Sequence, residues 1–243
     1  MTRPRVLLTG FGPFPGVAKN PSGWLAETLA GSASLPDASL PDFDLLAAVL
    51  PTEWATVATQ LPRLQAEFQP DLAIHFGVSV QADGLRIERA AHNRIGTRMD
   101  ASGSRPTRQD VVTGSPAQLQ TRLPVTTLAA RLRGQGINAR VSNSCGRYLC
   151  NDLYYRSLHW TSAHGGDALF VHVPLADGQE RTRWEGHTFS QETLLRAGHV
   201  ALHEVAKTMR KPHMSRRSIA APENERKRQD TRMGQDLQPR EST

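Results

Sequence analysis

A cysteine and a histidine in the C-terminal half of the chain are of the types that form a nucleophilic pair. Cys150 stands at the expected start of a helix, and His172 lies in an apolar strand between Val171 and Val173. The exposed N–H groups and dipole of a helix N-terminus stabilise a thiolate, and a neighbouring imidazole suits nucleophilic catalysis. A buried cysteine is also often an inert apolar residue, and a lone strand histidine is often structural. The two residues alone leave both interpretations open.

Whether Cys150 and His172 lie close together depends on the secondary-structure elements that carry them. The pattern predicts a strand at 137–141, a turn at 142–146, a helix at 148–160 and a strand at 168–173. A strand–helix–strand crossover is right-handed and usually places its strands side by side. We therefore expect the helix start and the end of the second strand at the same carboxyl edge of the sheet. His75, in an expected strand at 71–77, is the competing imidazole.

Glu88 is a candidate third member of the site. It lies in a segment of alternating character, 85–91, which reads as a short strand. A carboxylate there can orient an imidazole and stabilise its protonated form. Because Arg89 follows it directly, an edge-strand salt bridge is the alternative, and the pattern alone favours that alternative.

A glycine- and proline-rich loop follows the first expected strand, 5–9. The loop reads Gly10-Phe-Gly-Pro-Phe-Pro-Gly16 and leads to a helix start at Asn20-Pro-Ser22. Its glycine spacing differs from that of dinucleotide-binding loops, and prolines lack the N–H groups that a pyrophosphate needs, so nucleotide binding is disfavoured. Phe11 and Phe14 stand at the carboxyl end of the strand, where α/β sheets bind ligands. They either clamp a small ring or anchor the loop on the core.

Strands alternate with helices along the rest of the chain. This alternation predicts an α/β protein with a largely parallel sheet. The remaining expected elements are a strand at 44–50, helices at 53–68, 124–133 and 190–209, and loops at 31–42 and 96–116.

Length and composition exclude several classes of protein. With 243 residues, 38% of them hydrophobic, the chain can bury a sizeable core, which excludes a fully disordered, collagen-like or small disulfide-linked chain. No apolar run approaches the roughly 20 residues of a membrane span, and the first ten residues do not resemble a signal peptide. Two cysteines five residues apart fit neither a disulfide framework nor a zinc site. Free thiols and no targeting segment predict a cytoplasmic protein that binds no membrane.

The positive charge is concentrated at the C-terminus. The formal net charge is +6, of which residues 210–243 contribute +4 from nine basic and five acidic residues. This segment has no aromatic residue and no helical or strand period, so we expect a disordered basic tail. Nucleic-acid binding through phosphate contacts is an alternative for the tail, but a solvated extension is favoured because no aromatic residue supports base stacking.

Four segments together resemble the pyroglutamyl peptidase I (pyrrolidone-carboxylate peptidase) family of cysteine peptidases. They occur in the family's order, and the resemblance extends from residue 5 to about 207. The segments are 6–14 with 20–22, 87–93, 142–151 and 170–174.

The resemblance implies roles for the residues singled out above. Cys150 would be the nucleophile, His172 the base and Glu88 the residue that orients it, while Phe11 and Phe14 would hold the pyroglutamyl ring. Arg98 matches a family arginine proposed near the oxyanion.

The implied fold is a three-layer α/β/α sandwich around a mixed, mostly parallel sheet, with residues 1–209 as the catalytic domain. The family often forms homo-tetramers and uses no metal or other cofactor.

The implied activity is removal of an N-terminal pyroglutamyl residue from peptides through a thioester. The sequence departs from the family pattern beside the nucleophile, with Cys145 where alanine is usual and Arg147 where threonine is common. A catalytically silent homologue that binds a lactam or a peptide terminus is therefore the alternative.

Overall fold

The structure, a computed structural model, describes residues 3–32, 43–178 and 187–209. The expected tail at 210–243 and residues 33–42 of the expected loop lie outside these residues. The described elements are β1 (Arg5–Phe11), α1 (Pro21–Ser32), β2 (Asp44–Leu50), α2 (Trp54–Phe68), β3 (Leu72–Val78), β4 (Leu85–Glu88), β5 (Ala90–His92), β6 (Gln118–Gln120), α3 (Val125–Gly134), β7 (Ala139–Ser142), α4 (Leu149–His164), β8 (Asp167–Val173), β9 (Leu175–Ala176), β10 (Thr188–Phe189) and α5 (Gln191–Met209).

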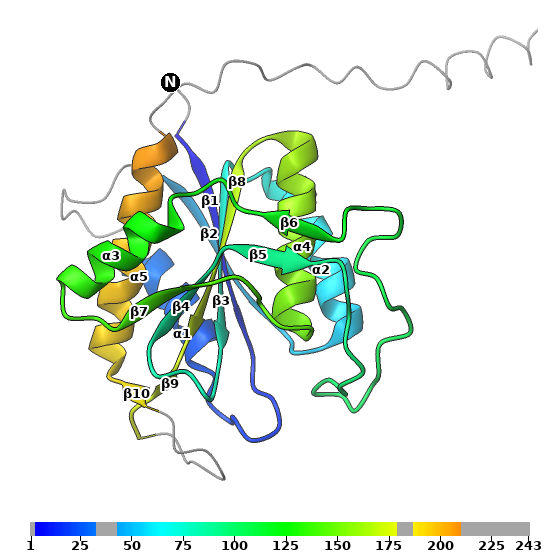
Figure 1. Ribbon diagram of the computed structural model, residues 1–243, viewed down its shortest axis with the longest axis horizontal. Helices are drawn as coiled ribbons and strands as arrows, with labels where there is room; N and C mark the ends of the chain where they lie inside the picture. The colour runs from blue at the N-terminus through cyan, green and yellow to red at the C-terminus, as the bar shows by residue number, and fades with distance from the viewer. Residues whose placement is uncertain (1–2, 33–42, 179–186, 210–243) are drawn as a thin grey trace, which may run out of the picture. The chain divides into compact units, whose positions relative to one another are not determined.

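Six strands form the central sheet in the order β2-β1-β3-β8-β4-β7 (Figure 1). The first four run parallel, β4 is antiparallel to β8, and β7 is parallel to β4. The apolar runs at 72–78 and 167–173 become the two central strands because both of their faces are covered, as continuous apolar runs in parallel sheets usually are. The predicted mixed, mostly parallel sheet is confirmed.

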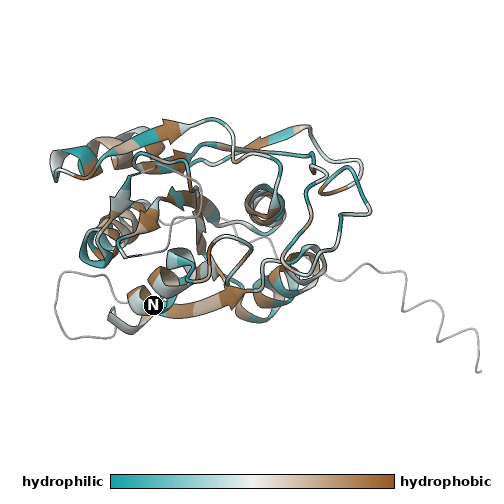
Figure 2. Ribbon diagram, turned by 90° about the horizontal axis from the view of Figure 1, so that it is seen from below, coloured by the Kyte–Doolittle hydropathy of each residue, from teal (hydrophilic) through white to brown (hydrophobic). Residues whose placement is uncertain are grey.

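Helices cover both faces of this sheet, so apolar strand residues lie between two helical layers (Figure 2). One core joins α1, α3 and α5 to the face that carries Val6, Ile74 and Val171. The other joins α2 and α4 to the opposite face, which carries Leu7, Ala73 and Phe170. This three-layer α/β/α arrangement confirms the predicted fold class. Among the described helices, none is long and apolar enough to cross a membrane.

The segment predicted as one strand at 85–91 is in fact two. It breaks at Arg89, after which β5 leaves the main sheet and pairs antiparallel with β6. The sequence analysis missed β6, and also β9 and β10, because strands of two or three residues carry too little alternation to be distinguished from loops.

The predicted crossover from β7 to β8 is wrong. The two strands are antiparallel to each other, and β4 lies between them. The chain leaves β7 at Ser142 and returns through residues 143–148 before α4 begins at Leu149. This return loop, rather than a right-handed parallel crossover, brings the start of α4 to the carboxyl end of β8.

Candidate active site

His172 and Glu88 form the polar centre of the sheet face that α2 and α4 cover. Arg86 and Glu88 of β4 pair in register with His172 and Phe170 of β8, so the four side chains share one face. The Nδ1 atom of His172 lies 2.8 Å from Oε1 of Glu88, and only 1% of the Glu88 surface is exposed. The carboxylate therefore fixes the ring orientation and leaves Nε2 for other partners.

Cys150 approaches this pair from the first turn of α4. The space for its sulfur comes from Gly77, which is in register with His172 on the neighbouring β3. A Cβ atom on Gly77 would lie 2.9 Å from Sγ of Cys150 and 2.7 Å from Cζ of Phe170, which is closer than Cβ contacts allow. Glycine is thus the residue that lets the thiol lie against the sheet. The sequence analysis used Gly77 only as the end of a strand and missed this role.

The electrostatics of His172 favour its charged form. Burial alone would lower its pKa, but a hydrogen bond and charge interaction with Cys150 and the contact with Glu88 raise the pKa to about 9. An imidazolium between the Cys150 sulfur and the Glu88 carboxylate is a charge arrangement that suits a thiol nucleophile.

Cys145 lies near the same groups, but its surroundings favour the neutral form of its thiol. It is 4% exposed, and burial raises the pKa of its thiol well above the usual value, with Cys150 and Glu88 adding to the shift. Cys145 therefore stays protonated at neutral pH. Both cysteines are free thiols, as predicted.

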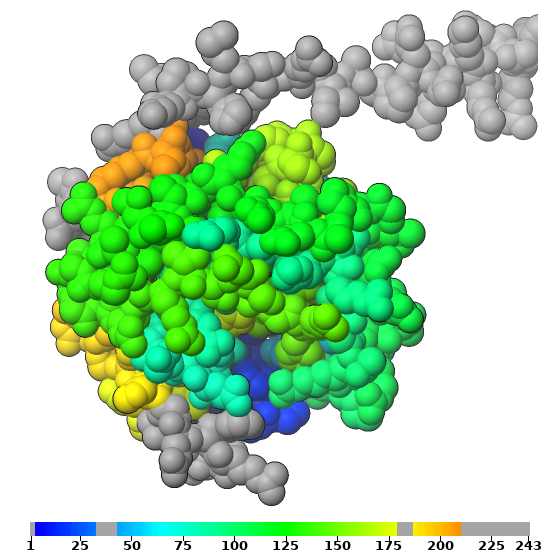
Figure 3. All heavy atoms as spheres, in the orientation of Figure 1, coloured from blue at the N-terminus to red at the C-terminus, as the bar shows by residue number. Residues whose placement is uncertain are grey.

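A cavity of about 430 Å³ opens beside the thiol and imidazole. Phe11 and Phe14 line it together with Cys150, His172 and Glu88. In the space-filling view a hollow appears where the blue N-terminal segment, the teal segment after β3 and the green loop that follows β5 come together (Figure 3). Of the two rings, Phe11 is the last residue of β1 rather than a loop residue, and it is 3% exposed, whereas Phe14 is only partly buried.

The loop that carries Phe14 is fixed by the residues that begin α1. The Asn20 side chain donates to the Gly12 carbonyl at 2.8 Å and accepts hydrogen bonds from Ser22, whose hydroxyl accepts from the Phe11 N–H at 3.0 Å. Phe14 and Val17 exchange two backbone hydrogen bonds across the loop tip. The Asn-Pro-Ser motif thus starts the helix and also sets the position of the phenylalanines.

Two arginines also line the cavity. Arg98 is exposed, and its guanidinium lies over the Tyr148 ring, 4.8 Å from the centroid, in a cation–π contact. Arg86 was not predicted to belong to the site; its Nε atom is buried and has no hydrogen-bond partner among the described residues. Alternation along β4 places Arg86 on the same face as Glu88, and this spacing of two was the signal that could have identified it.

The competing interpretations for His75 and Glu88 do not hold. His75 is fully buried on β3, its Nδ1 lies 2.8 Å from the Thr9 hydroxyl, and burial lowers its pKa to about 3. It does not line the cavity. Arg89 contacts Asn143 and Thr126 instead of Glu88, and β4 is an interior strand, so no edge-strand salt bridge forms.

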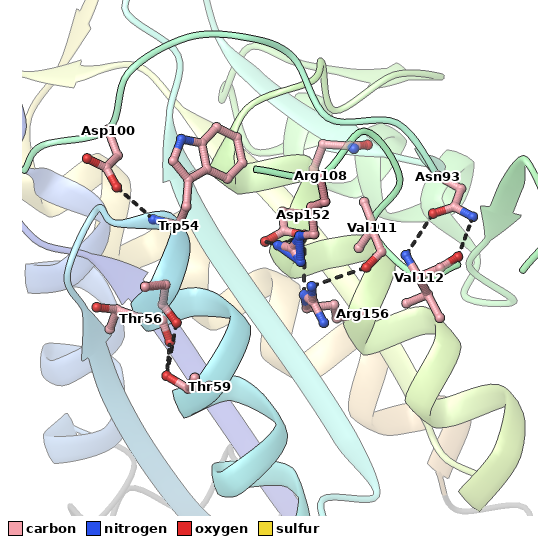
Figure 4. Close-up of polar contacts among 12 residues, drawn as sticks. Trp54, Thr56, Thr59, Asn93, Asp100, Arg108, Val111, Val112, Asp152 and Arg156 are labelled. Carbon is pink, nitrogen blue, oxygen red and sulfur yellow. Dashed lines mark hydrogen bonds and ion pairs between the residues drawn. The ribbon is translucent and has the colours of Figure 1, made fainter. Parts of the chain in front are cut away.

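A long loop after β5, residues 93–117, borders the site; two of its contacts anchor it to helices and a third closes the loop on itself (Figure 4). Asp100 accepts from the Trp54 N–H at the start of α2, and Asn93 exchanges hydrogen bonds with Val112. Arg108 makes two contacts with Asp152, at 2.8 and 3.0 Å. Because Asp152 lies two residues after Cys150, this ion pair ties the loop directly to the first turn of α4.

Asp152 gives a prediction about stability. Its side chain is fully buried, and Arg156 also contacts it, at 3.2 Å. Asp152→Ala would leave two guanidinium groups without their partner, so we expect the free energy of unfolding to fall by about 3–5 kcal/mol. Urea denaturation measures this change. The control, Glu67→Ala, removes an exposed ion pair with Arg63 and should have no measurable effect; equal losses in both variants would contradict the anchoring role.

A thiol at a helix start, an imidazole beside it and a buried carboxylate behind the imidazole define the site of a cysteine-dependent hydrolase on an α/β sandwich. Residues 4–208 match the family model of pyroglutamyl peptidase, Peptidase_C15. The chain belongs to this pyroglutamyl peptidase family.

Relatives and solved structures agree with this assignment. The chain is 35% identical to the pyrrolidone-carboxylate peptidase of Pyrococcus furiosus over 173 residues, which is 70% of this chain and 80% of the relative. It is 33% identical to that of Pseudomonas fluorescens, over 81% of this chain and 90% of the relative. The structure of pyroglutamyl peptidase I from Bacillus amyloliquefaciens matches with a TM-score of 0.75 at 28% identity, covering 84% and 98% of the two chains. The structure of the pyrrolidone carboxyl peptidase of Thermococcus litoralis matches with a TM-score of 0.77 at 28% identity, covering 90% of this chain and 99% of that chain.

Proposed function

We propose that the protein is a cysteine peptidase that removes an N-terminal pyroglutamyl residue from peptides. One observation carries the proposal: Cys150 and the His172–Glu88 pair line the same cavity as Phe11 and Phe14. Membership of the pyroglutamyl peptidase family supports this activity over a catalytically silent homologue.

The aromatic side of the cavity suits a pyroglutamyl ring. This ring is a small neutral lactam with no free amino group, so the substrate offers no N-terminal charge for recognition. Apolar contact with Phe14 and Phe11, combined with a few polar groups, fits such a ligand better than a charged pair would.

The first chemical step forms a thioester. The Cys150 thiolate attacks the carbonyl carbon between pyroglutamate and the next residue, and the carbonyl oxygen takes the negative charge. The N–H groups of Leu149 and Cys150, at the start of α4, are the backbone candidates for stabilising that oxyanion, with Arg98 as the candidate side chain. His172 then gives its proton from Nε2 to the leaving nitrogen, the C–N bond breaks, and the shortened peptide departs.

The second step returns the enzyme to its starting state. A water molecule attacks the thioester carbon while neutral His172 takes one of its protons. The C–S bond breaks, and the products are free pyroglutamate and the thiolate–imidazolium pair. Glu88 keeps Nδ1 oriented throughout, so the same Nε2 atom serves both steps.

A chromogenic pyroglutamyl amide tests this function directly. The purified full chain should release the chromogenic amine with turnover, whereas the matching prolyl amide, which lacks the lactam carbonyl, should be a poor substrate. Binding of the pyroglutamyl amide without release of the amine would support the silent homologue instead.

Phe14 gives a prediction about substrate recognition. Phe14→Ala should raise KM about tenfold, because the lost ring contact corresponds to roughly half the burial energy of a phenylalanine side chain. The turnover number should change less, since the variant leaves Cys150 and His172 in place. Met99→Ala is the control, because Met99 is 48% exposed and does not line the cavity; equal KM changes in both variants would argue against a ring clamp.

We also propose that residues 1–209 form the catalytic domain and that 210–243 are an appended tail. Deleting residues 213–243 should leave turnover and the melting temperature nearly unchanged, because this segment has no aromatic and few large apolar residues to bury. Kinetics and thermal unfolding of the two chains measure this. A large loss of turnover or of melting temperature would show that the tail docks on the domain. If the full chain binds DNA in a salt-sensitive manner and the shortened chain does not, the nucleic-acid alternative is supported.

Location and assembly complete the proposal. A cytoplasmic location is supported by two free thiols, which persist in a reducing compartment. We also propose that the protein assembles into a homo-oligomer, and specifically into the tetramer that is common in the family. Family membership is the ground for this proposal. Light scattering of the purified protein measures the oligomeric state.

A further inference from the structure

A second cavity, of about 540 Å³, adjoins the first. It lies against β5 and the loop after it, with His92, Arg94 and Asp110 among its lining residues. The two cavities have a common wall made of Ser144, Gly146 and Arg147. This wall, the 144–147 segment, also lines the cavity that contains Cys150 and His172, so it separates the second cavity from the one that holds the reacting groups.

The 144–147 segment is held in a defined position. The Gly96 N–H donates to the Arg147 carbonyl at 2.7 Å, which ties the wall to the loop after β5. The Arg147 side chain is exposed and borders both cavities. Its guanidinium is therefore free to contact a ligand that passes from one cavity to the other.

The charges around the two cavities do not balance. Glu88 is bonded to His172, and Asp110 lies 3.9 Å from Arg94. Arg147 has no carboxylate partner among the described residues, and the same holds for Arg86 and Arg98, which line the first cavity. The cleft thus presents surplus positive charge to a ligand.

The proposed reaction places the leaving peptide on this side. With the pyroglutamyl ring against the phenylalanines of the first cavity, the chain beyond the scissile bond must extend away from them. The second cavity, across the 144–147 segment, has the volume of an ordinary ligand pocket. The Arg147 guanidinium, which borders both cavities, matches a carboxylate in charge and geometry.

We propose that the second cavity binds the peptide segment released by hydrolysis and that Arg147 favours segments with a carboxylate near the scissile bond. The carboxylate belongs to an acidic residue directly after pyroglutamate or to the free C-terminus of a pyroglutamyl dipeptide. This inference rests on the proposed peptidase function and names its substrate class.

Two matched peptide pairs test the inference. One pair is pyroglutamyl-glutamate amide and pyroglutamyl-glutamine amide, and the other is pyroglutamyl-alanine with a free or an amidated carboxyl group. Because Arg147 is exposed, we expect kcat/KM to be about two- to fivefold higher for the charged member of each pair, mainly through KM. The preference should shrink as salt is raised from 0.01 to 0.5 M.

Arg147→Gln should remove the difference within each pair, because glutamine is polar but carries no charge. Arg63→Gln, an equal change of charge on the exposed face of α2, should retain the difference. Equal rates within the pairs for the wild type, or a preference that survives in Arg147→Gln, would overturn the inference while leaving the peptidase function intact. A wild type that hydrolyses neither member of a pair would overturn both.

Discussion

Cys150→Ser is expected to lower kcat/KM for a pyroglutamyl amide by about four orders of magnitude or more, which is the usual cost of removing a catalytic nucleophile. A serine hydroxyl in the same place cannot supply an accessible anion at neutral pH, because an alcohol is a much weaker acid than a thiol. Steady-state hydrolysis by wild type and variant at equal protein concentration measures the loss. Alkylation of the wild-type thiol should inactivate the enzyme, whereas a chelator should not, since none of the proposed steps uses a metal ion.

Cys145 provides the matched control within the same short segment. It lines the same cavity, but it is buried and its raised pKa keeps it protonated. Cys145→Ser and Cys145→Ala should therefore retain most of the turnover. Inactivation by an alkylating reagent should still occur in these variants, because it depends on modification of Cys150. Substantial hydrolysis by Cys150→Ser, or an equal loss in the Cys145 variants, would contradict a mechanism with Cys150 as nucleophile.

The layer architecture was predictable because it follows from local pattern. Buried parallel strands have apolar residues on both faces, so β3 and β8 appear as continuous apolar runs, and amphipathic helices separate them. Strand direction has no such local signature. The four-residue β7 has the same composition whether it runs with or against β8, and the return through residues 143–148 is visible only in three dimensions.

The site residues were predictable to different extents for the same reason. Residue type and the resemblance identified the thiol and the imidazole, although the crossover argument for their proximity used the wrong topology. The sequence could not show that Glu88 lies on an interior strand, because alternation is the same in edge and interior strands. Gly77 was missed because its function depends on a sulfur and a ring that come from other elements.

Glu88→Gln should lower turnover about 10- to 100-fold without unfolding the site. Glutamine keeps an oxygen acceptor for Nδ1 of His172, so the ring orientation and the Phe14 contact remain. It loses the charge, however, and a hydrogen bond to a charged partner contributes about 1.5–3 kcal/mol, which corresponds to roughly this change in rate. The effect should appear in kcat more than in KM, because the carboxylate supports the imidazolium and not the pyroglutamyl ring.

The pH profile separates this role from a purely structural one. The contact with Glu88 is one of the interactions that raise the pKa of His172 to about 9, so the thiolate–imidazolium pair loses its proton only as the pH rises through that value. Without the carboxylate this pKa falls, and the basic limb of kcat/KM should move to lower pH. Glu67→Gln, which removes an exposed carboxylate on α2, should leave the limb in place. If the normalised profiles of Glu88→Gln and wild type coincide, Glu88 has no part in the chemistry, and Cys150 and His172 act as a dyad.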